Sequence, residues 1–130
     1  LRVALEALQA AIDGLDIAPG AYATIEAEAF SDWSGGDLKS EAYHSDGDIG
    51  GITEGAWLRF DDLDFSGVAP QSVSISYANE QPAASTPSTA DVHAGGADGP
   101  IVATLSLAGT GSWANYTTVS ANISDGQALV

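Results

Sequence analysis

Beyond Gly20, apolar and polar residues alternate in short runs, and this period of two constrains the fold more than any other feature of the sequence. Alternation places successive side chains on opposite faces of an extended chain, so each run predicts a β-strand. The runs are residues 24–30, 57–60, 73–77, 101–107 and 116–123. Segments rich in Gly, Pro, Asp and Ser separate them at residues 34–50, 79–89 and 94–100. Short strands joined by turns, with no helical pattern after residue 15, predict an all-β fold, an antiparallel β-sandwich over residues 21–130.

The first 20 residues follow a different period. Apolar residues recur there at spacings of four and three, namely Leu1, Leu5, Leu8, Ile12 and Leu15. This spacing forms one apolar face of a helix, so we expect a short N-terminal α-helix that ends near Gly14 and a linker up to Gly20. Such a short helix is marginal in water without a partner. The segment is therefore expected to be a remnant of an upstream domain, a docking helix or an oligomerisation helix.

The charge of the chain excludes several partners. The sequence has 18 Asp and Glu residues against 3 Lys and Arg residues, a formal net charge of −15. Nucleic acids and anionic membrane surfaces require the basic residues that this chain lacks, so neither is expected as a partner. The chain has no Cys, which leaves no disulfide or thiolate metal site. No apolar run approaches the roughly 18 residues that span a bilayer, so no membrane span is expected.

The sequence offers little for catalysis. The histidines are His44 and His93, and neither has the spacing of a metal ligand or lies beside a motif serine. Carboxylates are so abundant that no particular pair indicates a glycosidase. We therefore expect a protein that is not an enzyme.

Two carboxylates are candidates for a metal site. Glu26 and Glu28 are two residues apart on a predicted strand, a spacing that projects both side chains to one face and suits Ca²⁺. The alternative is the solvated face of an edge strand. The stretch 46–48 reads Asp-Gly-Asp but lacks the later ligands of an EF-hand loop, so it predicts a turn.

Tryptophan side chains are the candidates for sugar binding, because sugar rings stack their apolar faces on aromatic rings. Trp113 follows the turn segment 109–112, which predicts a large ring at the mouth of a loop. Trp57 lies within an apolar run and is expected in the core. Trp33 precedes Ser-Gly-Gly, and its position in the sequence is compatible with either the core or sugar binding.

Seven segments resemble, in order, the sequence blocks of family 6 carbohydrate-binding modules. They are residues 24–30, 34–35, 49–60, 63–67, 72–78, 98–104 and 109–119. The resemblance covers about residues 22–130. It implies a jelly-roll β-sandwich that binds polysaccharide without cleaving it. The resemblance also implies a secreted, extracellular protein, usually attached to a glycoside hydrolase.

The resemblance also implies roles for particular residues. Glu26 and Glu28 match the acidic positions of the family that hold a structural calcium ion. Trp113 matches one of the two aromatic residues that clamp a sugar ring at the loop end of the sandwich. Glu41 matches an early-loop Glu that hydrogen-bonds the sugar, and Tyr43 is a further candidate from the same loop.

Two departures from the family pattern affect these expectations. Gly51 stands where the family usually has the second clamp aromatic, a Tyr. Trp33 or Tyr43 would then have to supply the missing ring. The family also continues past residues 125–130 with further strands, so we expect either a longer protein or a strand added from a neighbouring chain.

These observations predict a non-catalytic polysaccharide-binding module that targets an attached enzyme or surface protein to glycan. The alternative is a structural subunit of an extracellular assembly or adhesin, built on the same sandwich with strands exchanged between chains. A homo-oligomer through the N-terminal helix or an open edge strand would accompany that alternative.

Overall fold

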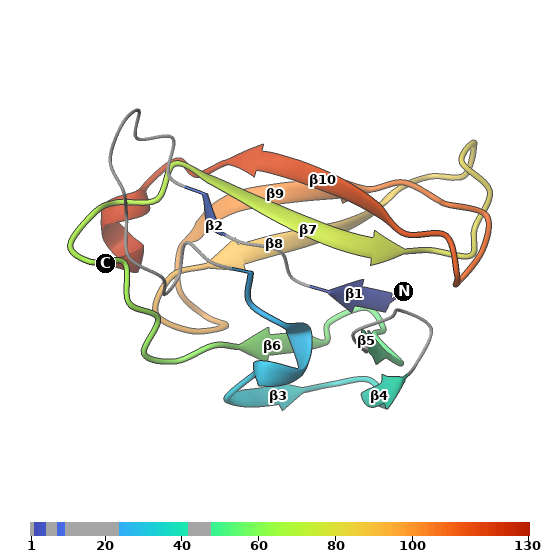
Figure 1. Cartoon of the computed structure of the whole chain (residues 1–130), viewed down its shortest axis with the longest axis horizontal. Helices are drawn as coiled ribbons and strands as arrows, with labels where there is room; N and C mark the ends of the chain where they lie inside the picture. Colours follow the sequence, from blue (N-terminus) through green and yellow to red (C-terminus); the bar gives the residue numbers. More distant parts are fainter. Residues whose placement is uncertain (1, 5–7, 10–23, 42–47) are drawn as a thin grey trace.

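The computed structural model describes residues 2–4, 8–9, 24–41 and 48–130, and nearly all its regular elements are strands (Figure 1). The strands are β1 (Arg2–Ala4), β2 (Leu8–Gln9), β3 (Asp32–Ser34), β4 (Lys39–Glu41), β5 (Asp48–Gly50), β6 (Trp57–Arg59), β7 (Ser72–Ala78), β8 (Ser88–His93), β9 (Ile101–Leu107) and β10 (Thr117–Asn122). Two short 3₁₀ helices, η1 (Ala27–Ala29) and η2 (Gly126–Leu129), complete the described elements. Within this described part no helix is long and apolar enough to cross a membrane.

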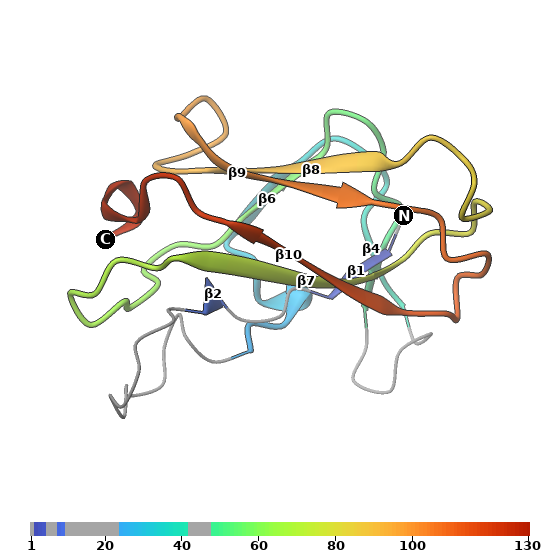
Figure 2. The same ribbon diagram turned by 90° about the horizontal axis from the view of Figure 1, so that it is seen from above.

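The largest sheet is built around β7. Its strand order is β10-β7-β1-β5-β4, and β2 also pairs with β7. All pairs in this sheet are antiparallel. Two smaller antiparallel sheets pair β3 with β6 and β8 with β9. Figure 2 shows β8 and β9 as a layer above β7 and β10, so the strands form a β-sandwich. The predicted all-β fold with antiparallel sheets is confirmed, while the jelly-roll connectivity stays a prediction.

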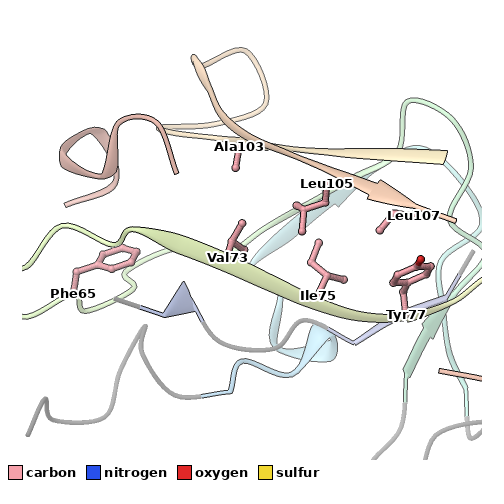
Figure 3. Close-up of a cluster of buried hydrophobic side chains, with 7 residues drawn as sticks. All are labelled: Phe65, Val73, Ile75, Tyr77, Ala103, Leu105 and Leu107. Carbon is pink, nitrogen blue, oxygen red and sulfur yellow. The ribbon is translucent and has the colours of Figure 1, made fainter. Parts of the chain in front are cut away.

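The hydrophobic core lies between β7 and β9. On β7 the apolar residues Val73, Ile75 and Tyr77 alternate with smaller residues, so their side chains share one face and point toward β9 (Figure 3). The buried cluster consists of Phe65, Val73, Ile75, Tyr77, Ala103, Leu105 and Leu107. Tyr77 donates a hydrogen bond from its hydroxyl to the Ala108 carbonyl, and burial raises the pKa of this tyrosine above its ordinary value. The alternation that predicts strands at 73–77 and 101–107 is thus confirmed.

The β3–β6 sheet supplies no residue to this cluster, whereas β9 of the β8–β9 sheet supplies Ala103, Leu105 and Leu107. In the β3–β6 pair, Arg59 forms ion pairs with Asp61 and Asp32, and the hydrogen bond with Asp61 raises the pKa of Arg59. Trp57, which the sequence places in the core, is only partly buried and does not belong to the core cluster. In the β8–β9 pair, His93 makes a hydrogen bond through Nδ1 to the Gly99 carbonyl, 2.8 Å away. This bond closes the turn after β8, so His93 has a structural role there.

The N-terminal α-helix expected over residues 1–15 is wrong where the structure describes it. Residues 2–4 and 8–9 form β1 and β2, and both pair with β7. Val3 also pairs with Ile49 of β5, so β1 lies between β7 and β5. A short isolated helix gains little in water, whereas a strand between two others pairs its backbone groups on both sides. The helical spacing of the leucines is therefore overridden by the tertiary context, and the other helix positions lie outside the described residues.

The strand expected over residues 24–30 is also wrong. Residues 27–29 form the 3₁₀ turn η1, in which the Ala29 amide donates to the Glu26 carbonyl. Ala27 is completely buried, and its small side chain lets the turn lie close against the neighbouring strands β1 and β5. Glu26 precedes this turn and Glu28 lies within it, so the alternation that suggests a strand does not continue through these residues.

Candidate functional site

Trp113 lies in the loop of residues 108–116, which joins β9 to β10 at the end of the sandwich where β7 also ends (Figure 1). Gly111 has a φ of +81°, which favours glycine, and open space surrounds the place where its Cβ would lie. The Asn115 amide donates to the Ser112 carbonyl and closes a tight turn around Trp113. The ring is partly buried. The sequence expectation of a large aromatic side chain on an end loop is consistent with this placement.

Asn79 fixes the base of this loop. It follows β7 directly, is 6% exposed, and its side-chain amide donates to the Leu107 carbonyl. Its backbone carbonyl accepts from the Thr110 amide at 2.7 Å and the Gly111 amide at 3.2 Å. A Cβ at Gly109 would lie 2.0 Å from the carbonyl oxygen of Gln81, so only glycine fits where the two loops touch. The loop that carries Trp113 is therefore held at a defined position.

A second polar contact connects distant segments at the same end. Asp48 begins β5 and is completely buried. Its Oδ2 accepts a hydrogen bond from the Tyr116 hydroxyl, whereas its Oδ1 is buried with no hydrogen-bond partner. The sequence predicts a turn at residues 46–48, so this buried carboxylate at the start of a strand is a correction to that prediction.

The two candidate calcium ligands differ in exposure. Glu26 precedes η1 and is exposed to solvent. Glu28 lies within η1, and both of its carboxylate oxygens are buried without a hydrogen-bond partner. Among the described residues, no group of three His, Cys, Asp or Glu side chains is arranged as a metal site. The two carboxylates therefore differ in exposure, and a calcium ion at this pair stays a prediction.

The expected sugar-binding residues are placed as follows. Glu41 is the last residue of β4, and its backbone pairs with that of Asp48. Tyr43 and His44 lie outside the described residues. The backbone pairing of β4 with β5 brings Glu41 into the same sheet as Asp48, whose side chain bonds Tyr116 just after the Trp113 turn.

Gly51 has no room for the aromatic side chain that the family resemblance expects. Its φ is +75°, and a Cβ would lie 1.8 Å from the carbonyl oxygen of Asp37. The Asp37 amide donates to the Gly51 carbonyl at 3.1 Å, so the two backbones are in direct contact. A ring cannot extend from this position without moving the 35–38 turn.

Trp33 belongs to a strand rather than to a loop. It lies in the middle of β3, paired with Leu58 of β6, and is 44% exposed. The smaller β3–β6 sheet does not include the loop of Trp113. Trp33 is therefore a separate exposed aromatic residue and a suitable control for Trp113.

An antiparallel β-sandwich with a Trp on an anchored end loop is an arrangement found in carbohydrate-binding β-sandwich modules. The model of the carbohydrate binding module (family 6) matches residues 26–129. The chain belongs to this family, whose members bind carbohydrate and are typically non-catalytic. The resemblance stated from the sequence is thus confirmed.

Comparison with solved structures and with curated proteins adds one relative. A β-1,3-glucan-binding family 6 module from Bacillus halodurans is 26% identical, with a TM-score of 0.64, over 76% of this chain and 71% of that chain. No curated protein matches the chain. The sequence alone does not reveal Asn79 or Asp48 as parts of the site, because their roles depend on contacts with loops about 30 and 68 positions away.

Proposed function

We propose that the chain is a non-catalytic module that binds a neutral polysaccharide by stacking a sugar ring on Trp113. The observation that carries this proposal is the position of Trp113 on a loop that Asn79 anchors at the end of the sandwich. An anchored aromatic ring loses little conformational freedom when a sugar stacks on it, so more of the stacking energy contributes to affinity. Glu41 and Tyr43 are proposed to hydrogen-bond the sugar.

β-1,3-Glucan is the first polysaccharide to test, because the B. halodurans module is described as β-1,3-glucan-binding. The module would direct an attached glycoside hydrolase or surface protein to that glycan outside the cell. The proposed jelly-roll connectivity places the loops that determine specificity at one end of the sandwich.

Affinity electrophoresis tests the proposal with a matched pair of variants. The chain migrates through gels with β-1,3-glucan, xylan, agarose or alginate, and Trp113→Ala is compared with Trp33→Ala. We expect β-1,3-glucan to retard the wild type and Trp33→Ala alike, and Trp113→Ala to bind roughly 5-fold more weakly, since one stacking face contributes about 1 kcal/mol. Equal retardation of Trp113→Ala and wild type, or loss in Trp33→Ala alone, would place the site elsewhere.

Calcium is proposed as a structural ion at Glu28, with Glu26 as the second acidic candidate. The buried oxygens of Glu28 have no hydrogen donor, and a hard cation is the ligand that such oxygens suit. When bound, the ion would neutralise the carboxylate and stabilise the turn η1 against the sheet.

The alternative function, a structural subunit with strands exchanged between chains, has less support. The position between β7 and β5 is filled by β1 of the same chain, so a strand from another chain is not needed there. A defined oligomer or filament in a size measurement would support the structural-subunit function.

A further inference from the structure

The sheet around β7 has a second face, which points away from β9. Val73, Ile75 and Tyr77 point toward β9 (Figure 3), so Ser76 and Ala78 lie on the opposite face. Ser76 is nevertheless only 5% exposed, and Ala78 is completely buried. This second face is therefore covered near the end of β7, although the core cluster lies on the other side of the sheet.

The strand register places Tyr116 on this covered face. Thr117 is directly opposite Tyr77 and therefore shares the face toward β9. Tyr116 is the residue before Thr117, so its side chain points to the other face. The small side chains of Ser76 and Ala78 leave room there for a large ring.

Asp48 lies on the same face, on the other side of the sheet. Val3 is directly opposite both Tyr77 and Ile49, so Ile49 points toward β9. Asp48 precedes Ile49 on β5 and therefore points away from β9, where it is completely buried. The Tyr116 hydroxyl donates a hydrogen bond to Oδ2 of Asp48, in agreement with both assignments.

This hydrogen bond joins strands that are not neighbours in the sheet. In the order β10-β7-β1-β5-β4, two strands lie between β10 and β5. The bond connects the residue just before β10 with the first residue of β5, and these residues are 68 positions apart in the sequence. Among the described strands, no backbone pairing links β10 to β5. The link between them is therefore made by side chains.

Each end of the hydrogen bond is adjacent to one part of the proposed sugar site. Tyr116 is the last residue of the loop that carries Trp113. The backbone of Asp48 pairs with that of Glu41, the last residue of β4. The hydrogen bond between Tyr116 and Asp48 therefore relates the position of the Trp113 loop to that of Glu41.

The energetics of this contact favour a role in positioning over a role in stability. Asp48 is completely buried, and Oδ1 has no hydrogen donor. Burial removes the hydration of a carboxylate, and an apolar pair of similar shape is often at least as stable as a buried polar pair. A directional polar contact in a buried place does, however, specify one arrangement of the two segments that it joins.

We propose that Tyr116 and Asp48 are positioning residues of the sugar site, whose hydrogen bond holds the Trp113 loop and β4 at a fixed spacing. The inference rests on the proposed function, in which a sugar stacks on Trp113 and forms a hydrogen bond with Glu41. Neither Tyr116 nor Asp48 needs to touch the sugar. A site whose two parts are already in place loses less conformational freedom on binding, so its affinity is higher.

Glycan affinity, Tm and amide hydrogen exchange, measured in one buffer, test this proposal. Affinity comes from electrophoresis over a range of concentrations of the polysaccharide that retards the wild type, β-1,3-glucan first. The variants are Tyr116→Phe, Asp48→Asn and the double variant Asp48→Leu with Tyr116→Phe. Asn keeps an oxygen that accepts from the tyrosine hydroxyl, whereas Leu has the branching of Asp without its polar atoms. Far-UV circular dichroism establishes that each variant is folded.

Ser120→Ala is the matched control. The Ser120 hydroxyl shares a hydrogen bond with the Ser74 hydroxyl, 2.7 Å away. This contact also starts from β10, but it joins β10 only to its neighbour β7. Ser120→Ala should therefore bind glycan like the wild type.

We expect Tyr116→Phe to bind the glycan roughly 3-fold more weakly, because its site is less well held before binding. Hydrogen exchange of residues 108–116 and 48–52 should increase together in this variant and stay unchanged in Ser120→Ala. Asp48→Asn should bind like the wild type. Tyr116→Phe should also lower Tm, since Asp48 loses its donor, whereas the double variant should regain Tm and keep the low affinity.

A merely structural role would make affinity follow Tm. A double variant that regains both would therefore overturn the inference, and so would equal affinity of Tyr116→Phe and the wild type. Should the double variant fail to fold, Asp48→Asn decides: a loss as large as that of Tyr116→Phe would mean that the charge matters and the hydrogen bond does not.

Failure of the proposed function gives a different result. If no polysaccharide retards the wild type, the proposed function fails, and the role of Tyr116 and Asp48 in sugar binding fails with it. Hydrogen exchange in the free chain then decides the remaining part of the inference. An increase in both segments of Tyr116→Phe would support the link between the Trp113 loop and β5, and unchanged exchange would contradict it.

Discussion

Gly51 illustrates how one residue restricts the sugar site. Any side chain there would meet the Asp37 carbonyl oxygen, 1.8 Å from the Cβ position, at a φ of +75°. We expect Gly51→Ala to lower the free energy of unfolding by about 3 kcal/mol, about 1–2 kcal/mol from the left-handed backbone and the rest from the steric overlap. Urea unfolding measures this change.

Gly55 provides the matched control for Gly51. Its φ is +82°, but nothing lies within 4 Å of the Cβ position. Gly55→Ala should therefore lose only the backbone contribution, about 1 kcal/mol. Equal losses in the two variants would mean that the contact with Asp37 does not affect the free energy of unfolding. Position 51 could then accept an aromatic residue.

Single residues differ in how far the sequence reveals them. Trp113 is predictable, because a large aromatic side chain after a glycine-rich turn is conspicuous without any tertiary information. Asn79 and Asp48 are not, because an Asn or Asp beside a turn is ordinary, and only the contacts with Thr110 and Tyr116 distinguish them. Long-range hydrogen bonds leave no periodic signal in the sequence.

Among the elements, the long buried strands were the predictable ones. β7 and β9 each have seven residues, which is long enough for the alternation of core residues with Ser or Thr to be visible in the sequence. β3, β4 and β5 have three residues each, too few to show a period, and they lie in or beside the Gly-rich segment 34–50 that predicts a loop. The helix predicted from the leucine spacing of residues 1–15 is wrong for a different reason. In the folded chain β1 pairs with β7 on one side and with β5 on the other.

The central position of β1 predicts that its backbone amides stabilise the sheet. Proline at Val3 would remove an amide from a strand paired on both sides, so Val3→Pro should lower the free energy of unfolding by about 3 kcal/mol or more. It should also promote association, because the exposed edges of β7 and β5 can pair with another chain. Urea unfolding and size-exclusion chromatography measure the two effects.

Val3→Ile is the control for this substitution, since it keeps the amide and the strand preference of a β-branched residue. It should behave like the wild type in both measurements. If Val3→Pro also unfolds and elutes like the wild type, β1 contributes nothing to the sheet, and the position between β7 and β5 is open to a strand from another chain.

For the molecule as a whole, the dominant property is its charge of −15. Like charges on a compact fold repel one another and lower its stability, and salt screens this repulsion. An increase in NaCl shortens the Debye length from roughly 30 Å at about 0.01 M to roughly 3 Å at about 1 M. In excess chelator we therefore expect Tm to rise with NaCl by several degrees, about 4 °C for each ~1 kcal/mol of repulsion removed. The double variant Glu80→Gln and Asp98→Asn, which neutralises two exposed acids, should show a higher Tm at low salt and a smaller rise.

The same charge should discriminate between glycans. An anionic polysaccharide such as alginate is repelled at low salt, whereas stacking of a neutral β-1,3-glucan on Trp113 involves no net charge. Retardation by β-1,3-glucan should therefore be nearly independent of NaCl, and alginate should not retard the chain at any concentration. For the salt dependence of stability predicted above, a Tm that stays constant or falls as NaCl increases would contradict the argument from charge repulsion. Strong retardation by alginate at low salt would show that a local cationic site outweighs the net charge, and the proposal of a neutral ligand would then fail.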